Sequence, residues 1–182
     1  MKKTALLITL LLLTCLALSA ETKAAPTACE KKAQLLLDKV LEVWNKGNLA
    51  LIPDLYTADC VATSSSTPAP FVGHEGIKQW IVNSRVMMPD LVMAFPEVVA
   101  QGDRIVTVWT MTGTQTGPMV MPGGTLPPTG RKISVTGMSI DYLKDGKMAK
   151  EVVVFNVLDM LMPLGFQLLP PAPPPPPAPP VK

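Results

Sequence analysis

Charged residues are scarce in this sequence of 182 residues, and their two signs nearly balance. Asp, Glu, Lys and Arg together make up 16% of the chain, and the formal net charge is +2. Lys and Arg form no run, and no basic stripe alternates with aromatic residues, which amount to only 5%. Because nucleic-acid binding depends on such a basic surface, we predict no nucleic-acid partner.

Histidine is equally rare, since His74 is the only one. No suitably spaced cysteine accompanies it, so the sequence predicts no zinc or other metal site. No serine lies in the pattern of a nucleophile elbow, which argues against a Ser-His-Asp hydrolase. His74 directly precedes a predicted helix, and we expect it to be structural rather than catalytic.

Cysteine occurs three times, and Cys15 lies in an N-terminal segment that we expect to be removed. The remaining two are Cys29 and Cys60. In an oxidising compartment they can form one disulfide, or they can remain two separate buried thiols. The sequence does not give the Cα separation that a disulfide requires, so both alternatives stay open.

The N-terminus has the three parts of a secretory signal peptide over residues 1–20. Lys2 and Lys3 form a basic start, an apolar run follows to Leu18, and Ser19 and Ala20 are small enough for a cleavage site. An apolar run of about 15 residues is short for a membrane-spanning helix. We therefore predict a cleaved signal, a flexible leader over residues 21–28, no membrane span after cleavage, and a periplasmic or secreted protein.

The C-terminus is a Pro-rich tail over residues 170–182, with nine prolines and two alanines between Pro170 and Pro180. Proline cannot donate a backbone hydrogen bond, so this run predicts an extended polyproline II segment rather than a helix or strand. The tail is either a spacer or a ligand for an aromatic-lined groove on a partner.

Residues 29–169, between these ends, have the composition of one folded domain. Apolar residues recur at helical spacing in the first part and with a period of two in the later part. The predicted helices are residues 29–46, 49–56, 75–87 and 157–164. The predicted strands are residues 59–62, 92–100, 104–116, 132–143 and 148–155. Residues 64–70 and 117–131 are predicted as loops, and Asp145-Gly146 as a hairpin turn.

Helices followed by a run of strands predict an α+β fold with an antiparallel sheet. We expect a cone-shaped α+β barrel, in which a curved antiparallel sheet packs on three helices and a ligand pocket opens at the mouth. Ten of the eleven methionines lie in this domain. They would give an adaptable apolar lining to such a pocket, or simply to the core.

Several segments of the domain form an ordered set of motifs. They are Val43 to Leu49, Gly73 to Lys78, Met88 to Leu91, Thr112 to Gly117, Pro128 to Arg131, Asp145 to Lys147, and Phe155 to Phe166. In this order and spacing they resemble SnoaL-like polyketide cyclases and the related ester cyclases of the nuclear transport factor 2-like superfamily. The resemblance implies the cone-shaped fold and an aldol-type ring closure by a carboxylate, without metal or cofactor.

The sequence departs from this family at the positions that the resemblance marks as the site. Gln115 stands where the family often has His within Gly-Thr-His-Thr-Gly. Ser139 and Asn156 stand where catalytic members often carry Asp. All three side chains can orient a carbonyl oxygen, but none can act as a base near pH 7. We therefore predict substrate-binding roles for them.

Strand alternation identifies the remaining candidates. Trp109 and Met111 share a strand face with Gln115, and their size indicates that this face lines the pocket. On the next strand Asp141 shares a face with Ser139. A carboxylate in such an apolar setting would have a raised pKa, so we predict Asp141 as the catalytic base. The alternative is a strand-end Asp that pairs with Lys or reaches solvent.

The last strand and the first helix supply two further expectations. Val152, Val154 and Asn156 share one face of the strand, which we expect to be the pocket side, and Glu151 would then face solvent. Trp44 is expected either to contact substrate or to pack the helix against the sheet.

These features predict an exported protein that binds a small apolar or aromatic carbonyl compound, with cofactor-free cyclase or isomerase chemistry if it is an enzyme. One alternative is a non-catalytic binding module of the same fold, which the missing His and Asp residues favour. Another is an assembly protein that engages a partner through its Pro-rich tail. We expect a homodimer, and in the assembly alternative the open face of the sheet would form it.

Overall fold

The computed structural model of the chain describes residues 27–170, with the exception of residue 122. The predicted signal peptide, most of the leader and the Pro-rich tail beyond Pro170 lie outside these residues. Within the described part, no helix is long and apolar enough to cross a membrane.

The first described helix, α2 (Ala28–Lys46), begins at a capping box. Thr27 Oγ1 accepts a hydrogen bond from the Glu30 backbone N–H at 3.2 Å, and Glu30 Oε2 accepts one from the Thr27 N–H at 2.7 Å. The helix ends at Gly47, whose φ of 73° is readily adopted by glycine. Its buried side chains follow helical spacing: Ala33, Leu37, Val40, Val43 and Trp44.

The other helical segments are short except for one, and they confirm the predicted helices. They are η2 (Leu49–Leu51), α3 (Ile52–Leu55), α4 (Gly73–Met87), α5 (Val157–Leu161) and η3 (Met162–Leu164). The longest of them, α4, buries Ile77, Ile81 and Met87. These apolar residues lie four and six residues apart, so one side of the helix faces the core.

Six strands form the main sheet in the order β2-β1-β8-β7-β4-β3. Their bounds are β1 (Tyr56–Ser64), β2 (Thr67–Val72), β3 (Val92–Gln101), β4 (Arg104–Thr114), β7 (Lys132–Lys144) and β8 (Lys147–Phe155). All neighbours pair antiparallel except β1 and β8, which are parallel. The strands therefore form a mixed sheet.

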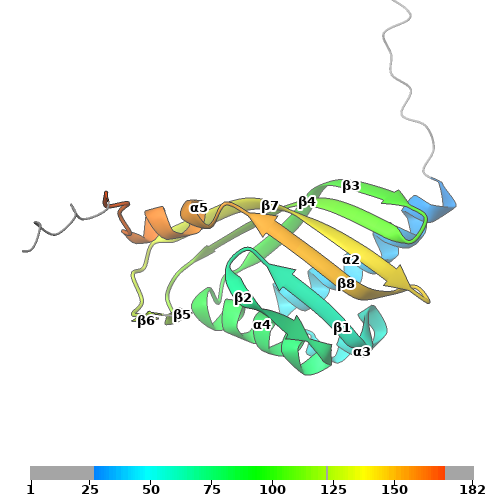
Figure 1. The fold of residues 1–182 in the computed structure, drawn as a ribbon, viewed down its shortest axis with the longest axis horizontal. Helices are drawn as coiled ribbons and strands as arrows, with labels where there is room; N and C mark the ends of the chain where they lie inside the picture. The colour runs from blue at the N-terminus through cyan, green and yellow to red at the C-terminus, as the bar shows by residue number, and fades with distance from the viewer. Residues whose placement is uncertain (1–26, 122, 171–182) are drawn as a thin grey trace, which may run out of the picture.

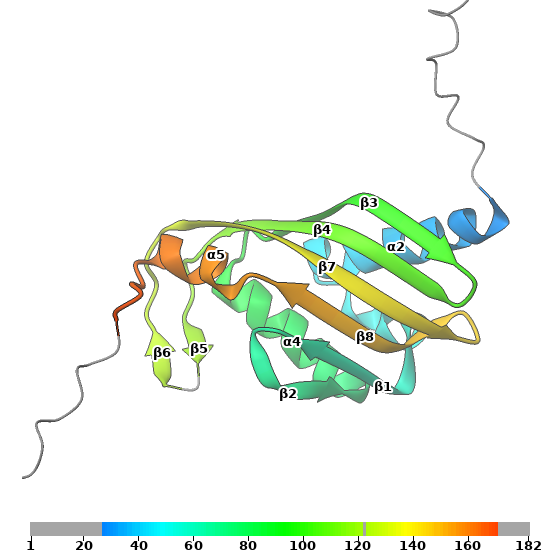
Figure 2. The ribbon, with the colours of Figure 1, turned by 45° about the horizontal axis from the view of Figure 1, so that its top comes forward.

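The helices cover one face of this curved sheet (Figure 1). Helix α2 packs against β3, and α4 packs against β1 and β2. A separate hairpin, β5 (Met119–Met121) with β6 (Gly124–Leu126), lies near α5 at one end of the molecule, and the start of α2 lies at the other (Figure 2). The predicted α+β class with a curved sheet on three helices is confirmed.

The structure differs from the expected elements in three places. The edge strand β2 begins inside the predicted loop 64–70, and an edge tolerates the missing N–H groups of Pro68 and Pro70. The predicted loop 117–131 contains the β5–β6 hairpin. The sheet is not purely antiparallel, because β1, the first strand of the domain, pairs with the last strand β8 in parallel orientation.

Candidate functional site

A cavity of about 520 Å³ lies between the inner face of the sheet and the helices α2 and α4. Its wall is mostly apolar and includes several methionines, among them Met93, Met111 and Met148. At the end where β5 and α5 lie, Met119 and Met160 line it. A space of this size fits a small organic molecule.

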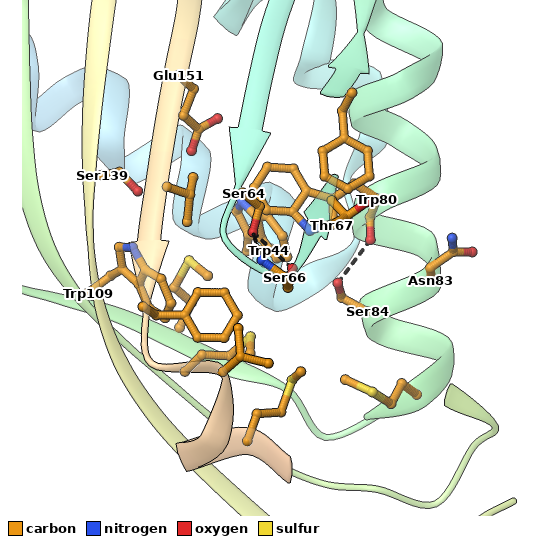
Figure 3. A pocket seen from close by; sticks show the side chains of 18 of the residues that line it. Trp44, Ser64, Ser66, Thr67, Trp80, Asn83, Ser84, Trp109, Ser139 and Glu151 are labelled. Carbon is orange, nitrogen blue, oxygen red and sulfur yellow. Dashed lines mark hydrogen bonds between the residues drawn. The ribbon is translucent and has the colours of Figure 1, made fainter. Parts of the chain in front are cut away.

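Two groups of aromatic side chains form opposite walls of the cavity. On the helix side, Trp44 meets Trp80 edge to face, with ring centroids 5.2 Å apart. Phe71 stacks on Trp80 at 4.6 Å with an interplanar angle of 3°. On the sheet side, Trp109 and Phe155 lie 5.6 Å apart. Figure 3 shows Trp44 and Trp80 facing Trp109 across the space.

The position of Trp109 depends on a glycine in the neighbouring strand. Gly137 on β7 is the register partner of Trp109 on β4. A Cβ atom at Gly137 would overlap the Trp109 ring and the Phe155 Cβ. The missing side chain therefore lets the indole lie across β7 and form part of the cavity wall.

Two carboxyl groups face the cavity from adjacent strands. Asp141 on β7 and Glu151 on β8 are direct antiparallel partners, so their side chains leave the same face of the sheet. Both line the cavity. Asp141 is only 3% exposed, and its Oδ1 has no hydrogen-bond partner among the described residues. A buried polar atom without a partner is costly when it is charged, so this environment favours the neutral form of the Asp141 carboxyl group.

A tyrosine from a third strand completes this group. The Tyr56 hydroxyl on β1 donates a hydrogen bond to Glu151 Oε2 at 3.3 Å. Burial raises the pKa of Glu151 to about 7, although the bond from Tyr56 opposes the shift. Burial, and then the charge of Glu151, raise the pKa of Asp141 well above its usual value. Burial and the two carboxylates also raise the pKa of Tyr56. Near neutral pH the two carboxyl groups therefore retain a proton that exposed carboxyl groups would already have lost.

Glu151 faces inward because β8 contains one extra residue. Leu143 pairs with Met148, whereas the next pairs are Tyr142 with Lys150 and Asp141 with Glu151. Ala149 is thus a bulge residue, and beyond it the side chains change faces. The prediction that Glu151 faces solvent was wrong for this reason. Val154, predicted inward, is 57% exposed, whereas Val153 lines the cavity.

The sequence matches the model of the SnoaL-like polyketide cyclase family over residues 34–164, which is most of the chain. This chain belongs to the SnoaL-like polyketide cyclase family. No curated protein matches it in sequence.

Solved structures with the same fold agree with this membership. TsrD from Streptomyces laurentii is 26% identical, with a TM-score of 0.65, over 74% of this chain and 96% of its own. A candidate SnoaL-like polyketide cyclase from Jannaschia sp. CCS1 is 18% identical, with a TM-score of 0.64, over 80% of this chain and 99% of its own. Wild-type IdmH from Streptomyces antibioticus is 23% identical, with a TM-score of 0.61, over 73% of this chain and 98% of its own.

Five of the residues singled out from the sequence of this SnoaL-like protein line the cavity: Trp44, Trp109, Met111, Ser139 and Asp141. Thr107 is opposite Ser139 across β4 and β7, and it lines the cavity as well. Sequence reasoning missed Tyr56 and Glu151 as residues of the site. The alternation that identified Trp109 on β4 also places Thr107 inward. No local sequence pattern indicates the bulge in β8 that directs Glu151 inward.

Gln115 is buried but does not line the cavity. Its Nε2 donates to the carbonyl oxygens of Gly117 at 2.7 Å and Pro127 at 3.2 Å. Its Oε1 accepts from the backbone N–H and the hydroxyl of Thr129, at 2.7 and 2.6 Å. The amide is fully used in joining the two ends of the segment that carries the β5–β6 hairpin. The predicted substrate contact is therefore replaced by a structural one.

Asn156 is exposed and is absent from the cavity wall. Its Oδ1 accepts a hydrogen bond from the Leu158 N–H at 3.2 Å, so it caps α5. Its Nδ2 donates to Asp159 Oδ1 at 2.8 Å. The predicted role in substrate binding is not supported by this position, because Asn156 follows the end of β8 and caps α5.

The remaining candidates are structural. An imidazole nitrogen of His74 lies 3.0 Å from the Tyr56 carbonyl oxygen and outside the cavity wall. Cys29 and Cys60 are free thiols, so the disulfide alternative is not the one found. Among the described residues, no three His, Cys, Asp or Glu side chains are grouped so that they could hold a metal ion.

Proposed function

We propose that this SnoaL-like protein binds a small, mostly apolar carbonyl compound in its cavity and catalyses proton transfer on it without a cofactor. The proposal rests on one observation: Asp141, which is 3% exposed and has an unpartnered carboxyl oxygen, lines an apolar cavity beside Glu151, its partner on β8.

Such a pair suits the removal of a proton next to a carbonyl group. A carboxyl group with a pKa near 7 is a much stronger base than an exposed one, and it still ionises at neutral pH. A neighbouring hydrogen-bond donor stabilises the negative charge that develops on the substrate oxygen. The resulting enolate can close a ring or take its proton back at another carbon.

The position of the pair explains how the family chemistry can persist despite Ser139. The resemblance places a catalytic Asp at this position, whereas here the carboxyl group comes two residues later, at Asp141. Ser139 and Asp141 lie on the same face of β7, about 7 Å apart along the strand. Both line the same cavity, so the acidic function is displaced rather than lost.

The test uses 2-tetralone, an apolar bicyclic ketone with acidic protons next to its carbonyl group. The protein without residues 1–20 is incubated with it in heavy water, and exchange of these protons is followed by proton NMR. We expect the wild-type protein to accelerate exchange and the double variant D141N/E151Q to abolish the acceleration. E97Q, which changes an exposed carboxylate on β3, is the matched control and should retain it.

A non-catalytic binding module is the second candidate, and it is favoured by the non-titrating Ser139, which lines the cavity where the resemblance places an Asp. Binding of 2-tetralone is measured in parallel through quenching of tryptophan fluorescence, since Trp44, Trp80 and Trp109 line the cavity. Saturable binding without any accelerated exchange would contradict the acid–base proposal and support the binding module.

We also propose that the protein is exported, on the basis of the basic, apolar and small segments of residues 1–20. Mass spectrometry of the protein expressed with its complete sequence in a bacterial host is expected to show a new N-terminus near Glu21 in the periplasmic fraction. A protein that keeps Met1 to Ala20 in the cytoplasmic fraction would contradict export.

A further inference from the structure

The two carboxyl groups of the cavity differ in their hydrogen-bond environment. Glu151 receives a hydrogen bond from the Tyr56 hydroxyl at 3.3 Å. Asp141 Oδ1 receives none from the described residues. A donated hydrogen bond favours the ionised form of a carboxyl group, whereas burial without a donor favours the neutral form.

We propose that Glu151 is the base of this site, that Asp141 is a neutral acid that donates to the substrate oxygen, and that Tyr56 positions Glu151. This inference rests on the proposed function and divides its work between two side chains. It differs from the sequence-based expectation, in which Asp141 was the base.

The charges around the pair support this division. In the described part of the chain, the cavity wall contains no Lys, Arg or His that could neutralise two carboxylates. From β1, Tyr56 and the Cys60 thiol lie nearby, and burial and the Glu151 charge raise the pKa of that thiol. His74 on α4 contacts the Tyr56 backbone carbonyl rather than either carboxyl group. Two negative charges side by side in this setting are unfavourable, so the pair keeps one proton.

The shared proton is expected on Asp141, for two reasons. Tyr56 is 3% exposed, and its hydroxyl donates to Glu151 rather than to solvent. This hydrogen bond stabilises the negative charge on Glu151. Asp141 is equally buried, and burial is the first cause that raises its pKa. A protonated Asp141 can then donate to a carbonyl oxygen in the cavity, which would satisfy the carboxyl group.

The proton transfers balance over one cycle. The Glu151 carboxylate takes the proton of the carbon next to the substrate carbonyl, and the electron pair of the broken C–H bond forms the enol. The carbonyl oxygen receives the proton of Asp141. The enol carbon then attacks a second carbonyl group of the same molecule, Glu151 gives its proton to the new alkoxide oxygen, and Asp141 recovers its own proton. Substrate and product are isomers, and no redox partner is needed.

The first measurement needs no substrate. Carbon-13 NMR of the protein labelled at the Asp and Glu carboxyl carbons follows each group through pH, with D141N and E151Q used to assign the two signals. We expect Glu151 to ionise first, near pH 7, and Asp141 to stay protonated until higher pH. Ionisation of Asp141 before Glu151 would overturn the inference, even if the protein catalyses exchange.

The second measurement uses the 2-tetralone exchange and its dependence on pH. We expect E151Q to lose about 1,000-fold in rate at every pH, whereas D141N should lose about 10- to 100-fold and keep the rise of the rate with pH. E151D, which retains a carboxylate, should recover part of the loss. An inactive D141N together with an active E151Q would assign the base to Asp141 and refute the proposal.

Tyr56 is tested as a positioning residue through the same profile. Without its hydroxyl, the charged form of Glu151 loses a donor, so Y56F should shift the rise of the rate toward higher pH while the maximal rate changes by less than about threefold. An unchanged midpoint would refute this role. If the wild-type protein shows no exchange at all, the proposed function fails, and the NMR titration alone decides where the proton lies.

Discussion

At the scale of single residues, the carboxyl pair makes folding depend on pH. The pKa of Glu151 is about 7 in the folded protein, against an ordinary value of 4.5, and that of Asp141 is also raised. Between these limits the folded state binds more protons than the unfolded state. The stability of the fold is therefore greatest below about pH 4 with respect to these groups, and it falls as the pH rises through about 7.

The first prediction follows from this loss of stability with rising pH. At pH 8 the D141N/E151Q variant should exceed the wild type in unfolding free energy by on the order of 1–3 kcal/mol, because a shift of one pKa unit corresponds to about 1.4 kcal/mol. At pH 4 the two proteins should be nearly equal. Urea unfolding at both pH values measures the difference, with E97Q as the control. A variant that is less stable than the wild type at pH 8 would contradict the raised pKa values.

The second prediction concerns the glycine beneath Trp109. In G137A the new methyl group overlaps the indole, so the ring must move into the cavity or the strands must separate. We expect a loss of about 1–3 kcal/mol in unfolding free energy and weaker binding of 2-tetralone. Thermal unfolding and fluorescence titration measure these effects. G123A is the matched control, because a Cβ at Gly123 meets no atom within 4 Å.

At the scale of elements, the β5–β6 hairpin is held in place through the side chain of Gln115. The four hydrogen bonds of its amide join residues 117, 127 and 129. Met119 and Met121 of the same hairpin line the cavity. The amide therefore acts on the cavity indirectly, through the element that borders it.

The third prediction tests this connection. In Q115A the backbone groups of residues 117–129 lose their partners, so we expect faster hydrogen exchange in peptides from this segment and a loss of about 1–3 kcal/mol in unfolding free energy. Peptides from β7 and β8 should exchange as in the wild type. Q79A removes an exposed amide on α4 and is the control. Unchanged exchange at residues 117–129 would show that the Gln115 amide is not needed to hold this segment in place.

The sequence was sufficient to predict most elements, since the periods in α2, α4, β4 and β7 are set by burial on one face. It was insufficient where local signals oppose the tertiary structure. Pro68 and Pro70 suggested a loop, yet an edge strand accepts them. In β8 the run from Val152 to Phe155 is apolar throughout, so its alternation could not show which side is inward. Consequently the site prediction was better on β4 and β7 than on β8.

At the scale of the whole molecule, none of the described helices covers the outer face of the sheet (Figure 1), and exposed apolar residues lie on that face. Met138 on β7 and Val154 on β8 are direct partners there, and they are 50% and 57% exposed. On β3, Val99 is 64% exposed. Exposed apolar patches of this kind are typical of association surfaces. The homodimer expected from the sequence stays a prediction, and this face is its expected interface.

The fourth prediction is that the protein without residues 1–20 is a dimer in solution at micromolar concentration, as measured by light scattering after gel filtration. Introducing like charges at the face in M138E/V154E should give a folded monomer. L35E places the same charge on an exposed position of α2 and should leave the dimer intact. A monomeric wild-type protein would refute the prediction.

The bulge at Ala149 has a consequence for how this chain is compared with its relatives. Insertion or deletion of a single codon there would exchange the inward side chains of β8 beyond the bulge for their outward neighbours, whereas no single base substitution could do so. One such event could thus replace the β8 side chains that line the cavity. An alignment that ignores this position would match Glu151 to residues of the opposite face, so relatives should be compared by strand register before their catalytic groups are equated.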